Sequence, residues 1–219
     1  MKKIKTCVID LSSKSAGHIA RRNSRKKAAG IAHPQAKAIL MKLENLIAEP
    51  PAGKMPTFFI LGENTACVTP MVKEFSSKHP PSPASDDGFL ERRLSIINIE
   101  APIGPSEGKL YSLILDRLQV KYREYYPPDQ KKSLIQTYFG VFKVDILIIN
   151  NFHRALKGPV TRRSALINAL KTIGHMCKIP IVVIGKKNII DMFGTDIWIS
   201  SEYLPVVLPD RDVGLPSRL

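Results

Sequence analysis

The feature that most restricts the fold of this chain is the alternation of short apolar runs with longer amphipathic segments. The strongest run lies within Val144–Ile149, and a second, Ile179–Ile184, ends at Gly185. An apolar run without regular polar alternation is typical of a strand that is buried on both faces of a parallel sheet. Parallel strands need crossover connections, which are usually helices. The sequence therefore predicts an α/β fold with helices on both faces of a parallel sheet.

Further segments continue this alternation. We predict additional strands at Thr57–Leu61, Leu94–Ile99 and Val206–Leu208. Apolar residues at three- and four-residue spacing predict helices over Ala36–Ile47, Met71–Phe75, Leu110–Val120, Gln130–Val141, Arg162–Met176 and Ile189–Phe193. The stretch His79–Gly88 is expected to be an exposed loop, because its prolines continue neither a helix nor a central strand.

The charge of the chain indicates the class of its partner. The 219 residues carry a net charge of +14, and residues 1–30 hold nine Lys or Arg residues against Asp10 alone, a net charge of +8. Such an arm can release counterions from a polyanion, so a nucleic acid is the natural partner. A mobile solubilising tail without a target is the alternative. The candidate DNA-binding residues of the arm are Arg21, Arg22, Arg25, Lys26 and Lys27.

Membrane and secretory functions are not indicated by the sequence. No run approaches the roughly 18 to 20 apolar residues of a membrane span, and the N-terminus lacks the apolar core of a secretory signal. We therefore expect a cytoplasmic protein without a membrane partner. The three cysteines are widely spaced, with no CxxC pair and no histidine at ligand spacing, so neither a disulfide framework nor a metal site is predicted.

The loop after Leu61 has the length of a phosphate-binding loop, G-x-x-x-x-G-K-[ST]. Gly62 and Thr69 fit its first and last positions, but Cys67 replaces the second glycine and Val68 replaces the lysine. That lysine neutralises β- and γ-phosphate charge, whereas a valine offers only apolar surface. We interpret the loop as a vestigial nucleotide site formed by Gly62, Glu63, Asn64, Thr65, Ala66, Cys67, Val68 and Thr69.

The apolar run that ends at Ile149 is followed by two amides, Asn150 and Asn151, where a nucleotide hydrolase has two acids. An amide at the first position brings no negative charge to Mg²⁺, and an amide at the second cannot take a proton from water. No cofactor is firmly predicted. ATP with magnesium could still bind through backbone N–H groups, but its binding is expected to be weakened.

This order of features resembles the TniB transposition proteins, which are relatives of TnsC in the AAA+ ATPase superfamily. The resemblance covers nearly all of the chain from about residue 30 and rests on GIAHPQAKAIL (Gly30–Leu40), MPTFFILGENTACVT (Met55–Thr69), LIINNFHR (Leu147–Arg154), IPIVVIG (Ile179–Gly185), Ser200–Tyr203 and Val207–Pro209. It implies a three-layer P-loop NTPase sheet with helices on both faces. Because the chain stops at Leu219, we expect no C-terminal helical lid.

The resemblance also implies a division of the chain and a set of altered positions. Residues 1–30 would be a basic arm, 31–209 an AAA+-like core and 210–219 a tail. His153 fits the small motif after the acids, Lys186 stands at a small polar sensor residue, and Glu202 stands where the family tends to present an arginine to a neighbouring subunit. We expect a pseudo-ATPase without catalytic residues, whose degenerate positions are Val68, Asn150, Asn151, Lys186 and Glu202.

A second basic segment is expected to contact the DNA backbone. By the same resemblance, the DNA-binding residues Lys109, Lys121 and Arg123 lie around the helix with which TnsC-like proteins contact DNA. The alternative is a solvated helix end whose tyrosines, Tyr122, Tyr125 and Tyr126, pack against the core. The pairs Lys131-Lys132 and Arg162-Arg163 are expected to be exposed helix starts.

Three functions are compatible with these patterns. Proteins resembling this one connect target selection, through a TniQ-like protein, with a TniA-like DDE transposase on double-stranded DNA. The first function is therefore a non-hydrolysing DNA-binding adaptor. The second is an active ATP-dependent regulator with unorthodox motifs. The third is a regulatory paralogue that modulates an intact TniB. For the chain in general, the expected assemblies are a homo-oligomer or a mixed assembly with an intact TniB.

Overall fold

The computed structural model describes residues 34–48, 57–63, 68–82, 93–189 and 205–208. Strands and helices alternate in it as the sequence predicts. The strands are β1 (Thr57–Leu61), β2 (Ile96–Glu100), β3 (Ile146–Asn150), β4 (Ile181–Gly185) and β5 (Val206–Val207). The helices are α2 (Pro34–Ala48), α3 (Val68–Lys78), α4 (Glu107–Leu118), α5 (Pro128–Val141), the 3-10 turn η2 (Phe152–Arg154) and α6 (Val160–Cys177). The predicted helix Ile189–Phe193, the arm 1–30 and the tail 210–219 lie almost wholly outside these residues.

The five strands form one parallel sheet in the order β2-β3-β4-β1-β5. Leu61 pairs with Gly185 and Glu100 pairs with Asn150, so these strands end at the same level. We call this side of the sheet the carboxyl edge. The β1–α3 loop, Asn150 and Lys186 all lie along it, because parallel strands present their ends together.

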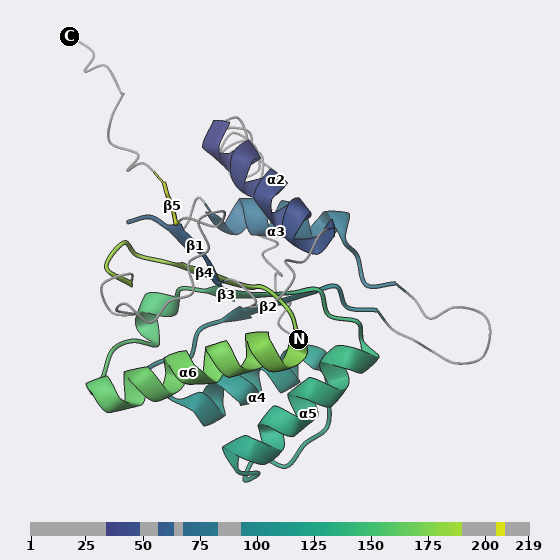
Figure 1. Cartoon of the computed structure of the whole chain (residues 1–219), viewed down its shortest axis with the longest axis vertical. Helices are drawn as coiled ribbons and strands as arrows, with labels where there is room; N and C mark the ends of the chain where they lie inside the picture. The colour runs from purple at the N-terminus through teal and green to yellow at the C-terminus, as the bar shows by residue number, and fades with distance from the viewer. Residues whose placement is uncertain (1–33, 49–56, 64–67, 83–92, 190–204, 209–219) are drawn as a thin grey trace, which may run out of the picture.

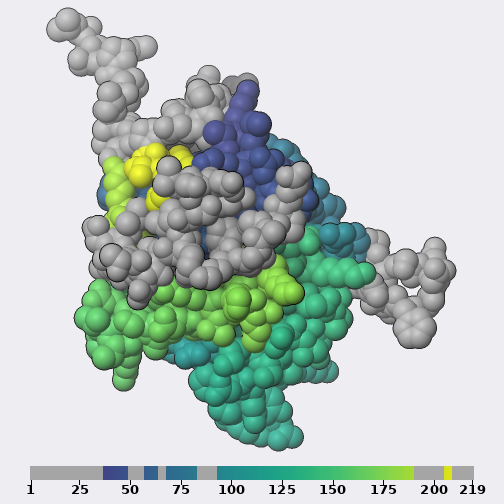
Figure 2. All heavy atoms as spheres, in the orientation of Figure 1, coloured from purple at the N-terminus to yellow at the C-terminus, as the bar shows by residue number. Residues whose placement is uncertain are grey.

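The two faces of the sheet are covered by different helices (Figure 1). Helices α4, α5 and α6 pack on one face, and α2 and α3 pack on the other. Alternate residues of each strand enter the two cores, as Phe58 and Phe59 of β1 illustrate. Figure 2 shows α5 and α6 on one side of the molecule and α2 on the opposite side. This three-layer arrangement confirms the predicted fold class.

The ends of the helices on the first face follow from local sequence. The Ser106 side chain accepts a hydrogen bond from the Lys109 backbone N–H at 3.4 Å and caps α4, whose last turn closes through Gln119 at a φ of 59°. Prolines precede α5 and α6, where a missing N–H costs nothing. Gly174 lets α6 approach β4 closely, because a Cβ there would lie 3.2 Å from Ile181 Cδ1.

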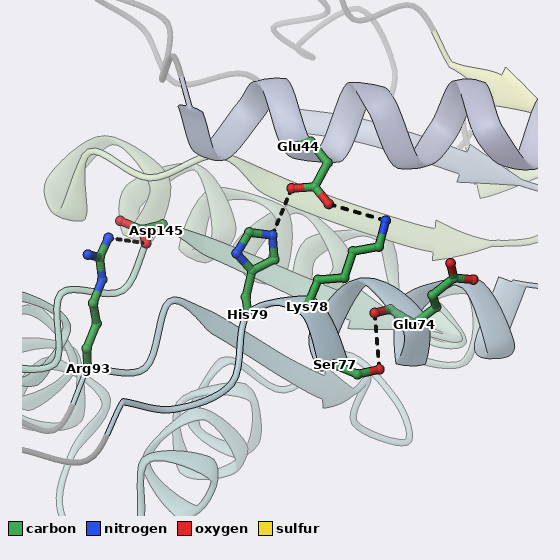
Figure 3. A network of polar contacts seen from close by, with 7 residues as sticks. All are labelled: Glu44, Glu74, Ser77, Lys78, His79, Arg93 and Asp145. Atoms are coloured by element: carbon green, nitrogen blue, oxygen red, sulfur yellow. Dashed lines mark hydrogen bonds and ion pairs between the residues drawn. The ribbon is translucent and has the colours of Figure 1, made fainter.

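Polar contacts tie α2 to the end of α3 on the second face (Figure 3). The Glu44 carboxylate accepts a hydrogen bond from His79 Nε2 at 2.8 Å and lies 3.8 Å from Lys78 Nζ. The His79 ring also packs edge-on against Phe75, with ring centroids 5.1 Å apart. A separate ion pair of 3.0 Å joins Arg93 to Asp145, just before β2 and β3 begin. No helix among the described residues is long and apolar enough to cross a membrane.

Candidate functional site

The β1–α3 connection occupies the position of a phosphate-binding loop in the sheet. Gly62 is buried, and its backbone N–H donates to the Gly185 carbonyl oxygen at 3.0 Å, which holds the start of the loop against β4. Glu63 is exposed. Asn64, Thr65, Ala66 and Cys67 lie outside the described residues. The loop therefore begins beside Gly185 and ends at Val68, the first residue of α3.

Val68 is part of the apolar core. Its exposed fraction is 1%, and it belongs to the cluster that α2 and α3 form with the sheet. The neighbouring Thr69 is exposed. The position expected for a phosphate-binding lysine thus holds an aliphatic side chain packed between a helix and the sheet.

Asn150, at the end of β3, is held by its neighbour strand. Its Nδ2 donates to Asn98 Oδ1 at 2.6 Å and to the Ile99 carbonyl oxygen at 3.2 Å. The amide nitrogen is therefore turned toward β2. What remains for a ligand is a neutral amide oxygen, which is a poorer partner for a divalent cation than a carboxylate.

Asn151 is the first residue after β3 and has a backbone φ of 53°, in the left-handed region. Its Nδ2 donates to Glu100 Oε2 at 2.8 Å. The carboxylate is exposed and lies at the end of β2. A carboxylate therefore lies next to Asn151, the position at which the sequence lacks an acid. This carboxylate comes from the neighbouring strand β2.

His153 and Lys186 lie where β3 and β4 end. A Cβ on Gly185 would lie 3.5 Å from His153 Nδ1, so the imidazole packs against that glycine. Nδ1 is buried and has no hydrogen-bond partner in the described part of the chain. Burial lowers the pKa of His153 below its usual 6.5, and the positive charges of Lys186, Lys157 and Arg154 lower it further. Lys186 itself is exposed.

These side chains do not fit a magnesium ion. Magnesium prefers carboxylate oxygens and bound phosphates, whereas Asn150 offers a neutral amide, the Glu100 carboxylate is engaged with Asn151, and Arg154, Lys157 and Lys186 are cations. Within the residues that the structure describes, no three His, Cys, Asp or Glu side chains gather as metal ligands do.

Three of the basic residues predicted to bind DNA lie on α4 and in the segment after it. Lys109 is exposed in the first turn of α4. Lys121 and Arg123 are exposed in the segment 119–127, which connects α4 to α5. Arg21, Arg22, Arg25, Lys26, Lys27 and Glu202 lie outside the described residues.

The tyrosines of this segment divide between two environments. The Tyr122 hydroxyl donates to Asp116 Oδ1 at 2.9 Å, and its ring packs against the core. Tyr125 is 74% exposed and lies beside Arg123, whose Nη1 donates to the Tyr125 hydroxyl at 2.6 Å. The alternative interpretation, in which the tyrosines pack against the core, fits Tyr122 and does not fit Tyr125.

Lys131 was expected to be exposed, and this expectation is wrong. It is 6% exposed, and its Nζ donates to Ser112 Oγ at 3.0 Å and to the Glu124 carbonyl oxygen at 2.8 Å. Nζ also lies 5.4 Å from the centroid of the Tyr122 ring. A lysine can be buried only when its ammonium group finds such partners. Lys131 therefore fastens the segment 119–127 to α4.

Sequence reasoning missed Asn98, Glu100 and the role of Lys131. Asn98 is a polar residue between Ile97 and Ile99, and this interruption of an apolar run could have indicated a polar contact. The pairing of Glu100 with Asn151 depends on the β2–β3 register, which no local pattern contains.

Comparisons with known proteins agree with this fold. The family model described as "Bacterial TniB protein" matches residues 21–212. No match was found among curated proteins. The structure is similar to the ORC2 protein of Aeropyrum pernix in its ADP form, with a TM-score of 0.50, 14% identity, and coverage of 82% of this chain and 48% of that one.

Two other solved structures are similar at lower TM-scores. The Cdc6p protein of Pyrobaculum aerophilum has a TM-score of 0.49 at 14% identity, covering 80% of this chain and 45% of that one. The Drosophila ORC bound to AT-rich DNA and Cdc6 has a TM-score of 0.47 at 14% identity, covering 94% and 35%. The chain thus spans less than half the length of each of these proteins.

Proposed function

Because this chain belongs to the bacterial TniB protein family, we propose that it is a DNA-binding adaptor of a transposition system and does not hydrolyse ATP. The chain is a transposition-related protein with a P-loop fold. The observation that carries the proposal is the burial of Val68, which is 1% exposed in the apolar core. In a P-loop enzyme the side chain at this position reaches the phosphates.

The chemistry at the end of β3 supports the same conclusion. Hydrolysis needs a metal anchor and a base, but Asn150 is a neutral amide turned toward Asn98. Asn151 is also an amide, and it is engaged with Glu100. The site has therefore lost its lysine and both acids, each of which contributes to a different step.

Affinity for DNA follows from charge. A protein with a net charge of +14 attracts the DNA backbone without reading its sequence. Lys121 and Arg123 are exposed on a segment that Lys131 fastens to α4, so they have a fixed position from which to contact phosphates. The arm residues Arg21 to Lys27 add a second basic group.

The partners belong to the same proposal. In a TniB-type system the adaptor connects a TniQ-like protein with a TniA-like transposase, on DNA, as a homo-oligomer or with an intact TniB. We assign DNA contact to the arm 1–30 and to Lys109, Lys121 and Arg123. The core 31–209 would present the protein contacts.

The test is a titration of fluorescent duplex DNA at increasing salt, with and without Mg-ATP, together with a phosphate-release assay. We expect binding with a steep salt dependence, no response to ATP and no phosphate release. Binding that requires ATP, or ATP turnover above that of the buffer, would contradict the proposal.

One observation favours an active ATP-dependent regulator as a second candidate. Glu100 Oε2 lies 2.8 Å from Asn151 Nδ2, so an exposed carboxylate is close to the position of the missing base. Such a group can take a proton from water. If the protein does release phosphate, Glu100→Gln should abolish turnover, and Glu124→Gln, an equally exposed acid on the segment 119–127, should not.

A further inference from the structure

Tyr125 presents an aromatic ring to solvent on the segment 119–127. It is 74% exposed, and it is the one aromatic residue among the large apolar side chains that are exposed in the described part of the chain. A ring in this position contributes little to the fold, because stabilisation by an apolar side chain requires its removal from water. The fold therefore does not explain why this position holds an aromatic residue.

Hydrogen bonds fix the backbone on both sides of Tyr125. The Tyr126 N–H donates to the Arg123 carbonyl oxygen at 3.0 Å and closes a turn. The buried Lys131 Nζ donates to the Glu124 carbonyl oxygen at 2.8 Å. Both chain neighbours of Tyr125 are thus held in place. A ligand that binds to the ring meets a prearranged surface, which lowers the entropic cost of binding.

Two side chains contact the Tyr125 ring without stacking flat on it. Arg123 Nη1 donates to the Tyr125 hydroxyl at 2.6 Å, and its guanidinium carbon lies 5.9 Å from the ring centroid, so Arg123 lies toward the hydroxyl end of the ring. The Tyr126 ring lies at a centroid distance of 5.7 Å, with the two ring planes at 86°. Together with the 74% exposure of Tyr125, this geometry leaves an aromatic face open to a flat ligand.

The residues around Tyr125 favour a nucleic-acid base as that ligand. Lys121 and Arg123 are exposed in the same segment, which contains one exposed acid, Glu124. The core of a protein interface is depleted in charged residues, whereas a base stacked on an aromatic ring is accompanied by phosphates that need positive charge. In a continuous duplex the base faces are covered by neighbouring bases, so only an unpaired base offers a face to Tyr125.

We propose that Tyr125 and Arg123 form a stacking site for an unpaired nucleobase, so that the protein binds DNA containing unpaired bases more tightly than a continuous duplex. The proposal rests on the DNA-binding function argued above and adds a preference to it. Phosphate contacts from Lys109 and Lys121 hold either kind of DNA equally. The Tyr125 ring contacts the base, and Arg123 holds the hydroxyl end of the ring.

The experiment compares two fluorescent DNAs of equal length by anisotropy titration with the full chain at one salt concentration. One DNA is a continuous duplex, and the other carries a short internal bubble of mismatched thymines. We expect tighter binding of the bubble. Tyr125→Leu should weaken binding of the bubble about tenfold and should leave binding of the duplex unchanged.

Two further variants separate stacking from charge. Tyr125→Phe keeps the ring and loses only the hydrogen bond to Arg123, so it should retain the preference for the bubble. Lys121→Gln removes an exposed cation and should weaken binding of both DNAs by the same factor, because phosphates are present in each. Since Tyr125 is exposed, its variants should fold, and thermal melts verify this.

The outcomes distinguish the stacking site from the function on which it rests. Equal affinity for the two DNAs would overturn the stacking site and leave DNA binding intact. A preference for the bubble that persists in Tyr125→Leu would also overturn it, because the flexibility of the bubble would then explain the preference. Failure of the unaltered protein to bind either DNA would overturn the DNA-binding function itself.

Discussion

At the scale of single residues, the site is defined by side chains whose chemistry opposes the expected reaction. Val68 is packed where a lysine would reach phosphate, and Asn150 bonds to Asn98 where an acid would face a metal. Lys186 and its basic neighbours act on His153. Val68 and Asn150 each replace a charged residue that a nucleotide hydrolase uses. Lys186 and its basic neighbours are positively charged, whereas the missing acids would be negatively charged.

Restoring the lysine should therefore damage the fold. Val68→Lys places an ammonium group in an apolar core, and we expect it to lower the free energy of unfolding by about 3 kcal/mol or more. Thr69→Lys, at the exposed neighbouring position, should change it by less than about 0.5 kcal/mol. Urea denaturation measures both. Equal stability of the two variants would mean that residue 68 can turn toward the phosphate loop.

His153 should report the positive charges of Lys186, Lys157 and Arg154. Its folded pKa lies below 6.5, first through burial and then through Lys186, so it is neutral at pH 7. The unfolded chain binds the His153 proton more tightly than the folded chain does. The stability that the neutral ring contributes is therefore present above pH 6.5 and is lost as the pH falls below that value. Lys186→Gln should raise the pKa of His153, as histidine NMR titration would show. An unchanged pKa would mean that Lys186 does not act on the ring.

At the scale of secondary-structure elements, apolar runs predicted the strands of the described residues, and hydrophobic periodicity predicted the positions of α2 to α6. The apolar runs at Thr57–Leu61 and Ile146–Ile149 were sufficient to predict β1 and β3, because central parallel strands are apolar on both faces. The partners of Glu100 and Lys131 were not predictable, because they depend on strand register and on where the segment 119–127 folds back. Local patterns contain neither kind of information.

The segment 119–127 should depend on one buried lysine. Lys131→Ala leaves the Glu124 carbonyl oxygen and Ser112 Oγ without their donor, and we expect a loss of about 1–3 kcal/mol in the free energy of unfolding. Amide hydrogen exchange in residues 119–127 should become faster, and DNA affinity should fall. Lys132→Ala is the matched control. It removes only the ion pair with the exposed Asp129, and an ion pair in solvent contributes little to stability. Similar exchange in both variants would contradict the anchoring role of Lys131.

At the scale of the whole molecule, charge is distributed unevenly along the chain. Residues 1–30 hold +8 of the net charge of +14. Replacing Arg21, Arg22, Arg25, Lys26 and Lys27 by Gln should reduce the salt slope of DNA binding by up to about 4.5, since each phosphate contact contributes about 0.9. Replacing Lys121 and Arg123 should reduce it by up to about two. A slope that only the second change reduces would identify the arm as a solubilising tail.

The connection between the arm and the folded core has a mechanical consequence. In the sequence the arm, residues 1–30, shortly precedes α2, whose apolar side packs on the sheet and whose Glu44 bonds to His79 at the end of α3. Tension applied to the arm by a moving DNA partner would enter the molecule at the first turn of α2 and would peel that helix away from its N-terminal end. The Glu44 contacts lie near the far end of α2, so they would resist last and would set how much load the helix bears before it detaches.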